Sequence, residues 1–241
     1  MHNQPLLPQS GFMMAFPKVI RYQFTQLVCT QSRFTMRIPL WIKMSYTLLV
    51  MVIIPVYWRD LGPANFLWFS DIALILLVPA LWLENRLISS TMAVGVLFLE
   101  SVWVLDFISG GNIIRIAAYM FDPELETHIR ILSGLFHLVL PPLLFYLLYR
   151  LGYDRRALAL QMLIAAVTLP ITYLVTEPES NINWVYGLAE PQQILPPLLY
   201  LVLLFLALTV CIYLPSHWLF KRFFSHRRNN QGVGVRPAQQ H

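Results

Sequence analysis

The sequence predicts an all-α fold, a polytopic membrane protein built as a bundle of six transmembrane helices with both termini in the cytoplasm. The chain has 241 residues, of which 57% are hydrophobic and only 12% charged; a soluble domain carries about twice that charge. Six apolar segments approach the roughly 20 residues that a helix needs to cross a bilayer. Basic residues gather on the side of the bundle that holds both termini, which the positive-inside rule makes cytoplasmic.

The spans follow one another through short connections on the inner side and longer ones on the outer side. We expect them at residues 41–58, 65–83, 87–108, 130–149, 157–175 and 195–214. Of the seventeen Lys and Arg residues, all but Arg59, Arg115 and Arg130 fall on the inner side of this topology. The acidic residues show the opposite distribution, which is hard to obtain from a wrong topology.

Three segments differ in character along the chain. Residues 1–35 look unlike the rest, and we expect them to be a poorly defined cytoplasmic segment upstream of a natural start at Met36. The six-helix domain covers residues 36–220, and residues 221–241 form a basic disordered tail. The tail is predicted to bind the anionic lipids of the inner leaflet. Nucleic acid is excluded as a partner, because the basic residues are scattered over loop ends without a binding fold.

Polar residues reach one common depth in the outer half of the predicted bundle. From the helical rise, Asp71 lies about 9 Å and His137 about 10 Å below the outer ends of their spans. Thr168 reaches a similar depth, and Glu100 lies a little deeper. Embedded polar groups normally face the bundle interior or a water-filled cavity, so the sequence predicts a polar pocket that opens outward.

Chemistry in this pocket is predicted to rest on three catalytic residues. Asp71 and His137 form an acid/base pair, and Glu100 tunes it. Two structural interpretations stay open: Asp71 as a strut between helices, and His137 as the partner in an interhelical hydrogen bond. A hydroxyl nucleophile such as Ser133 is also an alternative, with His137 as its base. A metal site is disfavoured because the spacing of typical ligand motifs is missing, and no cofactor is predicted.

Two outer loops are expected to cover the pocket. Residues 109–128 are predicted to form a short amphipathic surface helix after a Gly-Gly turn. Residues 176–194 form an unusually long hairpin connection, which is more often functional than merely connective. Asp106, at the rim of the third span, is expected to have a solvated structural role. The residues predicted to bind substrate are Asn183, Trp184, Trp103, Thr168 and Thr172.

Three stretches carry a resemblance to known proteins: "GPANFLWFSDIAL", "FHLVLPPLLFYLLYRLGYDRRA" and "NINWVYGLAEPQQILPPLLYL". Over residues 36–220 the chain resembles a family of uncharacterised bacterial inner-membrane proteins, which implies a multi-pass protein of that membrane. More remotely, it is similar to androgen-induced-type intramembrane hydrolases and related membrane acyltransferases. Those enzymes act on lipid esters through a Thr or Cys nucleophile and a His, and the resemblance implies the role of base for His137.

The sequence therefore leads to an integral membrane protein with an outward-opening polar pocket, interpreted first as an intramembrane lipid hydrolase or acyltransferase. Two alternatives from other classes remain: a proton- or cation-coupled transporter, and a non-catalytic membrane scaffold or assembly factor. The transporter is disfavoured because the inner halves of the spans are almost wholly apolar and no matching repeats are visible.

Overall fold

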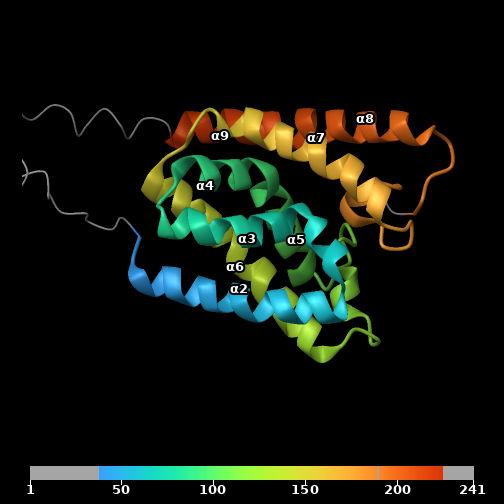
Figure 1. Cartoon of the computed structure of the whole chain (residues 1–241), viewed down its shortest axis with the longest axis horizontal. Coiled ribbons are helices and arrows are strands. Elements are labelled where there is room, and N and C mark those ends of the chain that lie inside the picture. The colour runs from blue at the N-terminus through green and yellow to red at the C-terminus, as the bar shows by residue number, and fades with distance from the viewer. Residues whose placement is uncertain (1–37, 189, 225–241) are drawn as a thin grey trace, which may run out of the picture. The chain divides into compact units, whose positions relative to one another are not determined.

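The computed structural model of the chain describes residues 38–188 and 190–224, and in this part every regular element is a helix (Figure 1). Five of the helices are long and apolar enough to cross a membrane. They are α2 (Leu40–Asp60), the continuous helix Arg86–Ile108 formed by α4 (Arg86–Met92) and α5 (Phe98–Ile108), α6 (Thr127–Leu151), α7 (Ala157–Val175), and the continuous helix Pro197–Phe224 formed by α8 (Pro197–Leu208) and α9 (Leu214–Phe224). An all-α fold with several such helices is the construction of a polytopic membrane protein.

The second predicted span is shorter than expected. Its α-helix, α3, covers Phe69–Trp82, only 14 residues, or about 21 Å against a hydrocarbon core of about 30 Å. The residues in front of it form a separate 3-10 turn, Pro63–Leu67. The prediction of one helix over 65–83 is therefore corrected, because the chain bends at Trp68 and α3 begins only at Phe69.

The continuous α4–α5 helix lies at the centre of the described bundle. It packs against α3, α6 and α7, while α2 packs against α3 and α6. Figure 1 shows α2 on one side of these helices and α8 and α9 on the other. At one end Lys43 Nζ donates to Glu84 Oε1 over 3.0 Å, and at the opposite end His128 Nε2 lies 2.7 Å from Asp60 Oδ2. We call the end with Lys43 the basic end and the end with Asp60 the acidic end of the bundle.

The α4–α5 helix and the α8–α9 helix each contain one π turn, at Ala93–Leu97 and Thr209–Tyr213, and the two turns pack against each other. Gly95 is needed in the first turn because a Cβ atom there would lie 2.6 Å from Cδ of the Gln161 side chain. The buried Gln161 amide thus occupies the space that a larger residue would fill.

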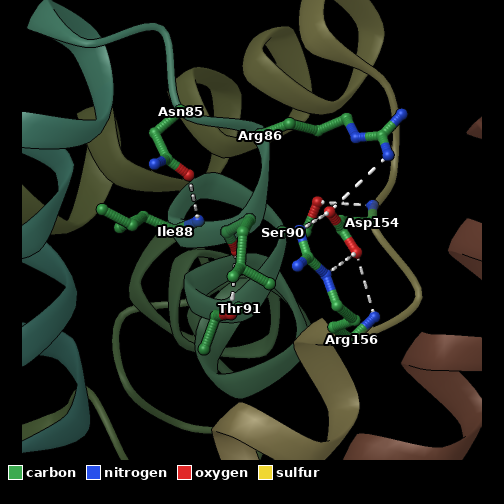
Figure 2. Close-up of polar contacts among 8 residues, drawn as sticks. Asn85, Arg86, Ile88, Ser90, Thr91, Asp154 and Arg156 are labelled. Atoms are coloured by element: carbon green, nitrogen blue, oxygen red, sulfur yellow. Dashed lines mark hydrogen bonds and ion pairs between the residues drawn. The ribbon is translucent and has the colours of Figure 1, made fainter.

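Asp154 joins the 152–156 connection to α4 at the basic end (Figure 2). Its carboxylate accepts from Arg156 over 3.0 Å and lies 3.6 Å from Arg86, and its backbone N–H donates to Ser90 Oγ. The hydrogen bond from Arg156 lowers the pKa of Asp154. Asn85 accepts a backbone hydrogen bond in the first turn of α4 and so caps that helix.

The bounds of the remaining spans follow the predictions, with one large difference at the C-terminal end. The last span was expected to end at residue 214, yet the helix continues to Phe224. Ser216 and Phe220 continue its buried stripe at helical spacing while the mean hydropathy falls. Lys221 and Arg222, expected in a disordered tail, are therefore helical. The predictions for residues 1–35, and for the tail beyond Phe224, lie outside the described residues.

Candidate functional site

Glu100 and His137 form a hydrogen-bonded pair where α5 packs against α6. The Glu100 Oε2 and His137 Nδ1 atoms are 2.7 Å apart, and the side chains are 7% and 12% exposed. Glu100 comes from the start of α5, just after the π turn. No hydrogen bond or ion pair joins His137 to Asp71, although both belong to the described residues. The carboxylate paired with the predicted base is thus Glu100 rather than Asp71.

Trp103 covers the imidazole of His137. The two rings are stacked with their centroids 4.2 Å apart and an interplanar angle of 23°. Trp103 lies one turn after Glu100 on α5, so the pairing carboxylate and the covering ring come from the same helical face. The Trp103 Nε1 atom is buried and makes no hydrogen bond of regular geometry among the described residues, although its N–H group lies near enough to the Tyr119 hydroxyl to act on the pKa of that group. An N–H group without a well-formed hydrogen bond therefore lies next to the predicted base.

Proline adds a second free polar group to this turn of α6. The helix continues through Pro141 and Pro142. Because proline has no backbone N–H, Pro141 removes the intrahelical hydrogen bond that the carbonyl of His137 would otherwise accept. The imidazole of His137 is thus paired with a carboxylate, and its backbone carbonyl lacks the hydrogen bond that a helical residue usually accepts.

Asp71 lies in the first turn of α3 and is 3% exposed. Its Oδ1 atom is buried and without a hydrogen-bond partner within the described residues. Asp71 lies near Glu100 and near the buried side chains of Tyr46 and Tyr57. The interpretation of Asp71 as a hydrogen-bonded strut finds no partner to support it.

Asn183 connects the long outer loop to the start of α3. Its Oδ1 accepts from the backbone N–H of Phe69 over 3.1 Å, and its Nδ2 donates to the Leu67 carbonyl over 2.7 Å. The side chain is buried and comes from the 3-10 turn Ile182–Trp184. Trp184 packs edge-on against Trp68. The predicted substrate-binding pair thus lies over the entry of α3, and Asn183 fixes the turn that carries Asp71.

The hydroxyl groups of Ser133 and Thr172 are both engaged in hydrogen bonds away from His137. Ser133 Oγ lies 3.0 Å from Tyr119 Oη, and burial raises the pKa of Tyr119 to about 12. Thr172 Oγ1 donates to the carbonyl of Thr168 inside α7, the usual arrangement of a structural threonine in a helix. Thr168 and Thr172 lie on α7, which packs against α4 and the first π turn.

Asp106 organises the 109–126 loop. Its carboxylate accepts from the backbone N–H groups of Ile113, Ile114 and Ala117 at 2.9–3.0 Å. The residue is 1% exposed, so its role is structural but not solvated as expected. The predicted surface helix is also corrected, since the segment contains a single 3-10 turn at Ala118–Phe121. Because these backbone N–H groups donate to Asp106, they are not available for the hydrogen bonds of a helix.

Two grooves open on the α5–α6 face. One has a volume of about 710 Å³ and lies between α5, α6 and α9, where Ser101 and Pro141 line it. The other has a volume of about 600 Å³ and lies between the 109–126 loop and α6, where Leu138 lines it. We call the first the α9 groove and the second, which Arg130 also lines, the Arg130 groove. Neither Glu100 nor His137 lines a groove itself, but Ser101, which follows Glu100, lines the first groove, and Leu138, which follows His137, lines the second.

Comparisons with protein-family models, with curated proteins and with solved structures found no match. In the described part of the chain, no three His, Cys, Asp or Glu side chains are grouped closely enough to hold a metal ion. The site is therefore characterised by its own geometry: a Glu–His pair, a covering Trp whose N–H group makes no well-formed hydrogen bond, and two apolar grooves lined by the same two helices.

Proposed function

We propose that this protein is an integral membrane enzyme that hydrolyses lipid esters with the Glu100–His137 pair. One observation carries the proposal: a carboxylate hydrogen-bonded to a histidine inside helices that can span a membrane, each helix also lining an apolar groove. A carboxylate that holds one imidazole nitrogen fixes the tautomer and leaves the other nitrogen to act as a base. Grooves of several hundred cubic ångströms have the size and lining of sites for small hydrophobic ligands.

The proposed topology has six spans, with α3 as the short second one. Both termini then lie in the cytoplasm, and the chain is a multi-pass protein of a bacterial inner membrane. Support comes from Lys43, Arg86 and Arg156, which lie at the same end of the bundle through their ion pairs with Glu84 and Asp154. The bent entry of α3 is compatible with this topology, because irregular backbone at membrane depth is tolerated where it is buried in protein.

The proposed reaction begins with Nδ1–H of His137 donating to the Glu100 carboxylate. His137 Nε2 then takes a proton from a water molecule while the water oxygen attacks the ester carbonyl carbon. The resulting oxyanion accepts a hydrogen bond from the Trp103 Nε1–H. The tetrahedral intermediate collapses, the ester C–O bond breaks, and the proton on His137 passes to the leaving alkoxide, so that acid and alcohol are released. Water is the nucleophile because the Ser133 and Thr172 hydroxyls are hydrogen-bonded elsewhere.

A proton-coupled transporter is the second candidate, and Asp71 is the observation that favours it. A buried carboxyl group without a partner, near a second carboxyl group at Glu100, is the kind of group that carries protons in membrane transporters. This alternative predicts pH-driven flux that Asp71→Asn abolishes.

The test uses the full-length protein in phospholipid nanodiscs, with release of fatty acid measured by mass spectrometry. His137→Gln is expected to lower the rate by about 10²–10⁴-fold, the usual contribution of general acid–base catalysis. Glu100→Gln should keep a hydrogen bond to His137 but lose the negative charge, and so give an intermediate loss. The matched control is His217→Gln, because His217 is also hydrogen-bonded but pairs with Tyr153 at the basic end.

Equal rates for wild type and His137→Gln would refute the assignment of the base. Loss in His217→Gln to the same extent as in His137→Gln would show that the change acts on folding rather than on the site. If hydrolysis is absent in wild type and Asp71→Asn abolishes proton flux, the transporter replaces the hydrolase.

A further inference from the structure

The Arg130 groove contains a cation without a carboxylate partner. The groove runs from the 109–126 loop along α6, and its lining includes Phe107, Phe121, Gly134 and Leu138. Arg130 is the charged member of this otherwise apolar lining. It is the fourth residue of α6, close to the end of that span, which is the level of lipid headgroups in a bilayer.

Backbone carbonyls hold the Arg130 side chain at the mouth of the groove. Its Nη2 donates to the carbonyl oxygens of Asp122 over 2.6 Å and of Leu125 over 3.1 Å. Its Nε is buried and has no hydrogen-bond partner in the described part of the chain. No ion pair to a described carboxylate compensates the guanidinium charge. A positioned, uncompensated guanidinium is suited to binding a phosphate group.

A carboxylate lies beside this cation. Asp122 is exposed, its carbonyl touches Arg130, and its Oδ1 accepts only the backbone N–H of Glu124 over 2.9 Å. It forms no ion pair with any described residue. Asp122 does not line the groove itself, but its backbone contact places it next to Arg130 at the mouth, and the two charged side chains form no ion pair with each other.

We propose that the Arg130 groove binds a phospholipid with an ammonium-bearing zwitterionic headgroup, such as phosphatidylethanolamine. The lipid phosphate binds Arg130, the ammonium group binds Asp122, and one acyl chain lies along α6 as far as Leu138. Charge complementarity selects this occupant, since a purely anionic lipid would place its headgroup beside the acidic residues Asp122, Glu124 and Glu126. The apolar lining matches the chain.

The groove and the candidate active site share α6. Leu138, the lining residue furthest along α6, follows His137 in the sequence, so the acyl chain of a lipid bound at Arg130 reaches the turn that carries the proposed base. Binding of the lipid does not depend on the hydrolase assignment; identifying that lipid as the substrate rests on the proposed function.

The experiment measures lipid binding to the full chain by native mass spectrometry, with phosphatidylethanolamine and phosphatidylglycerol of the same acyl chains added to delipidated protein. Wild type should prefer phosphatidylethanolamine. Arg130→Gln should weaken binding of both lipids by about tenfold or more, the loss of one charge-assisted contact. Asp122→Asn should remove the preference while phosphatidylglycerol binding is retained. Ile131→Trp, which fills the groove from an exposed lining position, should weaken both lipids without changing a charge.

The matched control is Arg115→Gln, which makes the same charge change at an exposed position of the same loop and should leave binding unchanged. Equal binding of the two lipids by wild type, or equal effects of Arg130→Gln and Arg115→Gln, would overturn the proposal. His137→Gln should bind the lipid normally. If it does and hydrolysis continues, the enzyme assignment fails while the lipid site stands; if Arg130→Gln binds normally and His137→Gln is inactive, the lipid site fails while the enzyme assignment stands.

Discussion

Replacing Asn183 by Ala is the sharpest test of how the outer loop supports α3. The change removes the partners of two backbone groups, the N–H of Phe69 and the carbonyl of Leu67. A buried group left unsatisfied costs about 1–3 kcal/mol, whereas side-chain hydrogen bonds measured in bilayers average about 0.6 kcal/mol. For two groups we expect a loss of about 2–4 kcal/mol in the free energy of unfolding. At about 2–4 °C per kcal/mol, the melting temperature in detergent should fall by about 4–16 °C.

Asn181→Ala is the matched control for this change. Asn181 and Asn183 both have positive φ, at 36° and 53°, so the backbone cost of alanine in the left-handed region is shared by the two variants. The Asn181 amide bonds to Gly187 and Tyr186, inside its own loop, where water can replace it. Asn183→Ala should therefore melt clearly below Asn181→Ala. Equal melting temperatures would refute the claim that Asn183 anchors α3.

Three further predictions concern other parts of the fold. Gly95→Ala should destabilise the protein by about 1–3 kcal/mol through overpacking, and the loss should largely disappear in the Gly95→Ala/Gln161→Ala double variant, measured by thermal unfolding. The pKa of Asp154 is lowered by Arg156, so its stabilisation is present above the ordinary pKa of 3.8 and lost as the pH falls through the folded-state value. Wild type should therefore lose melting temperature below pH 3.8 more steeply than Asp154→Asn. Tyr119→Phe removes the bond to Ser133 and should cost about 0.5–1.5 kcal/mol; burial raises the Tyr119 pKa to about 12, so the wild-type minus variant ultraviolet spectrum should show tyrosinate only near that pH.

Local sequence was sufficient for helices bounded by local signals. α7 occupies Ala157–Val175, the range predicted from an apolar run between a pair of arginines and a polar Thr-Glu-Pro segment. α3 was not predictable in the same way, because its start depends on a hydrogen bond that the backbone N–H of Phe69 donates to Asn183, 114 residues away. The prediction of a surface helix in the 109–126 loop was wrong for a similar reason. Its amphipathic pattern favours a helix, yet its backbone N–H groups donate to Asp106 instead.

The candidate site was predictable in its members but not in its pairing. Glu100 and His137 came from the common depth of polar residues, which depends only on the helical rise, and Trp103 came from its position between Glu100 and Asp106 on the same helix. Which carboxylate meets His137 depends on the rotation of each helix about its own axis. That rotation is set by packing, here by α5 lying against α6, and depth along the chain carries no information on it. Asp71, at a similar depth to His137 but on α3, has no bond to it.

The position of Asp71 is a consequence of how α3 begins. A carboxylate two turns inside a predicted 19-residue span looks anomalous, yet in the structure it is the third residue of a helix that starts at Phe69. The first turn of a helix directs unpaired N–H groups toward its N-terminus and favours a nearby acid. Asn183 and Trp184 close this turn from the outer loop, so the acid stays buried without a cation. Without the two hydrogen bonds from the Asn183 side chain, the start of α3 and the burial of Asp71 would both lose their support from the outer loop.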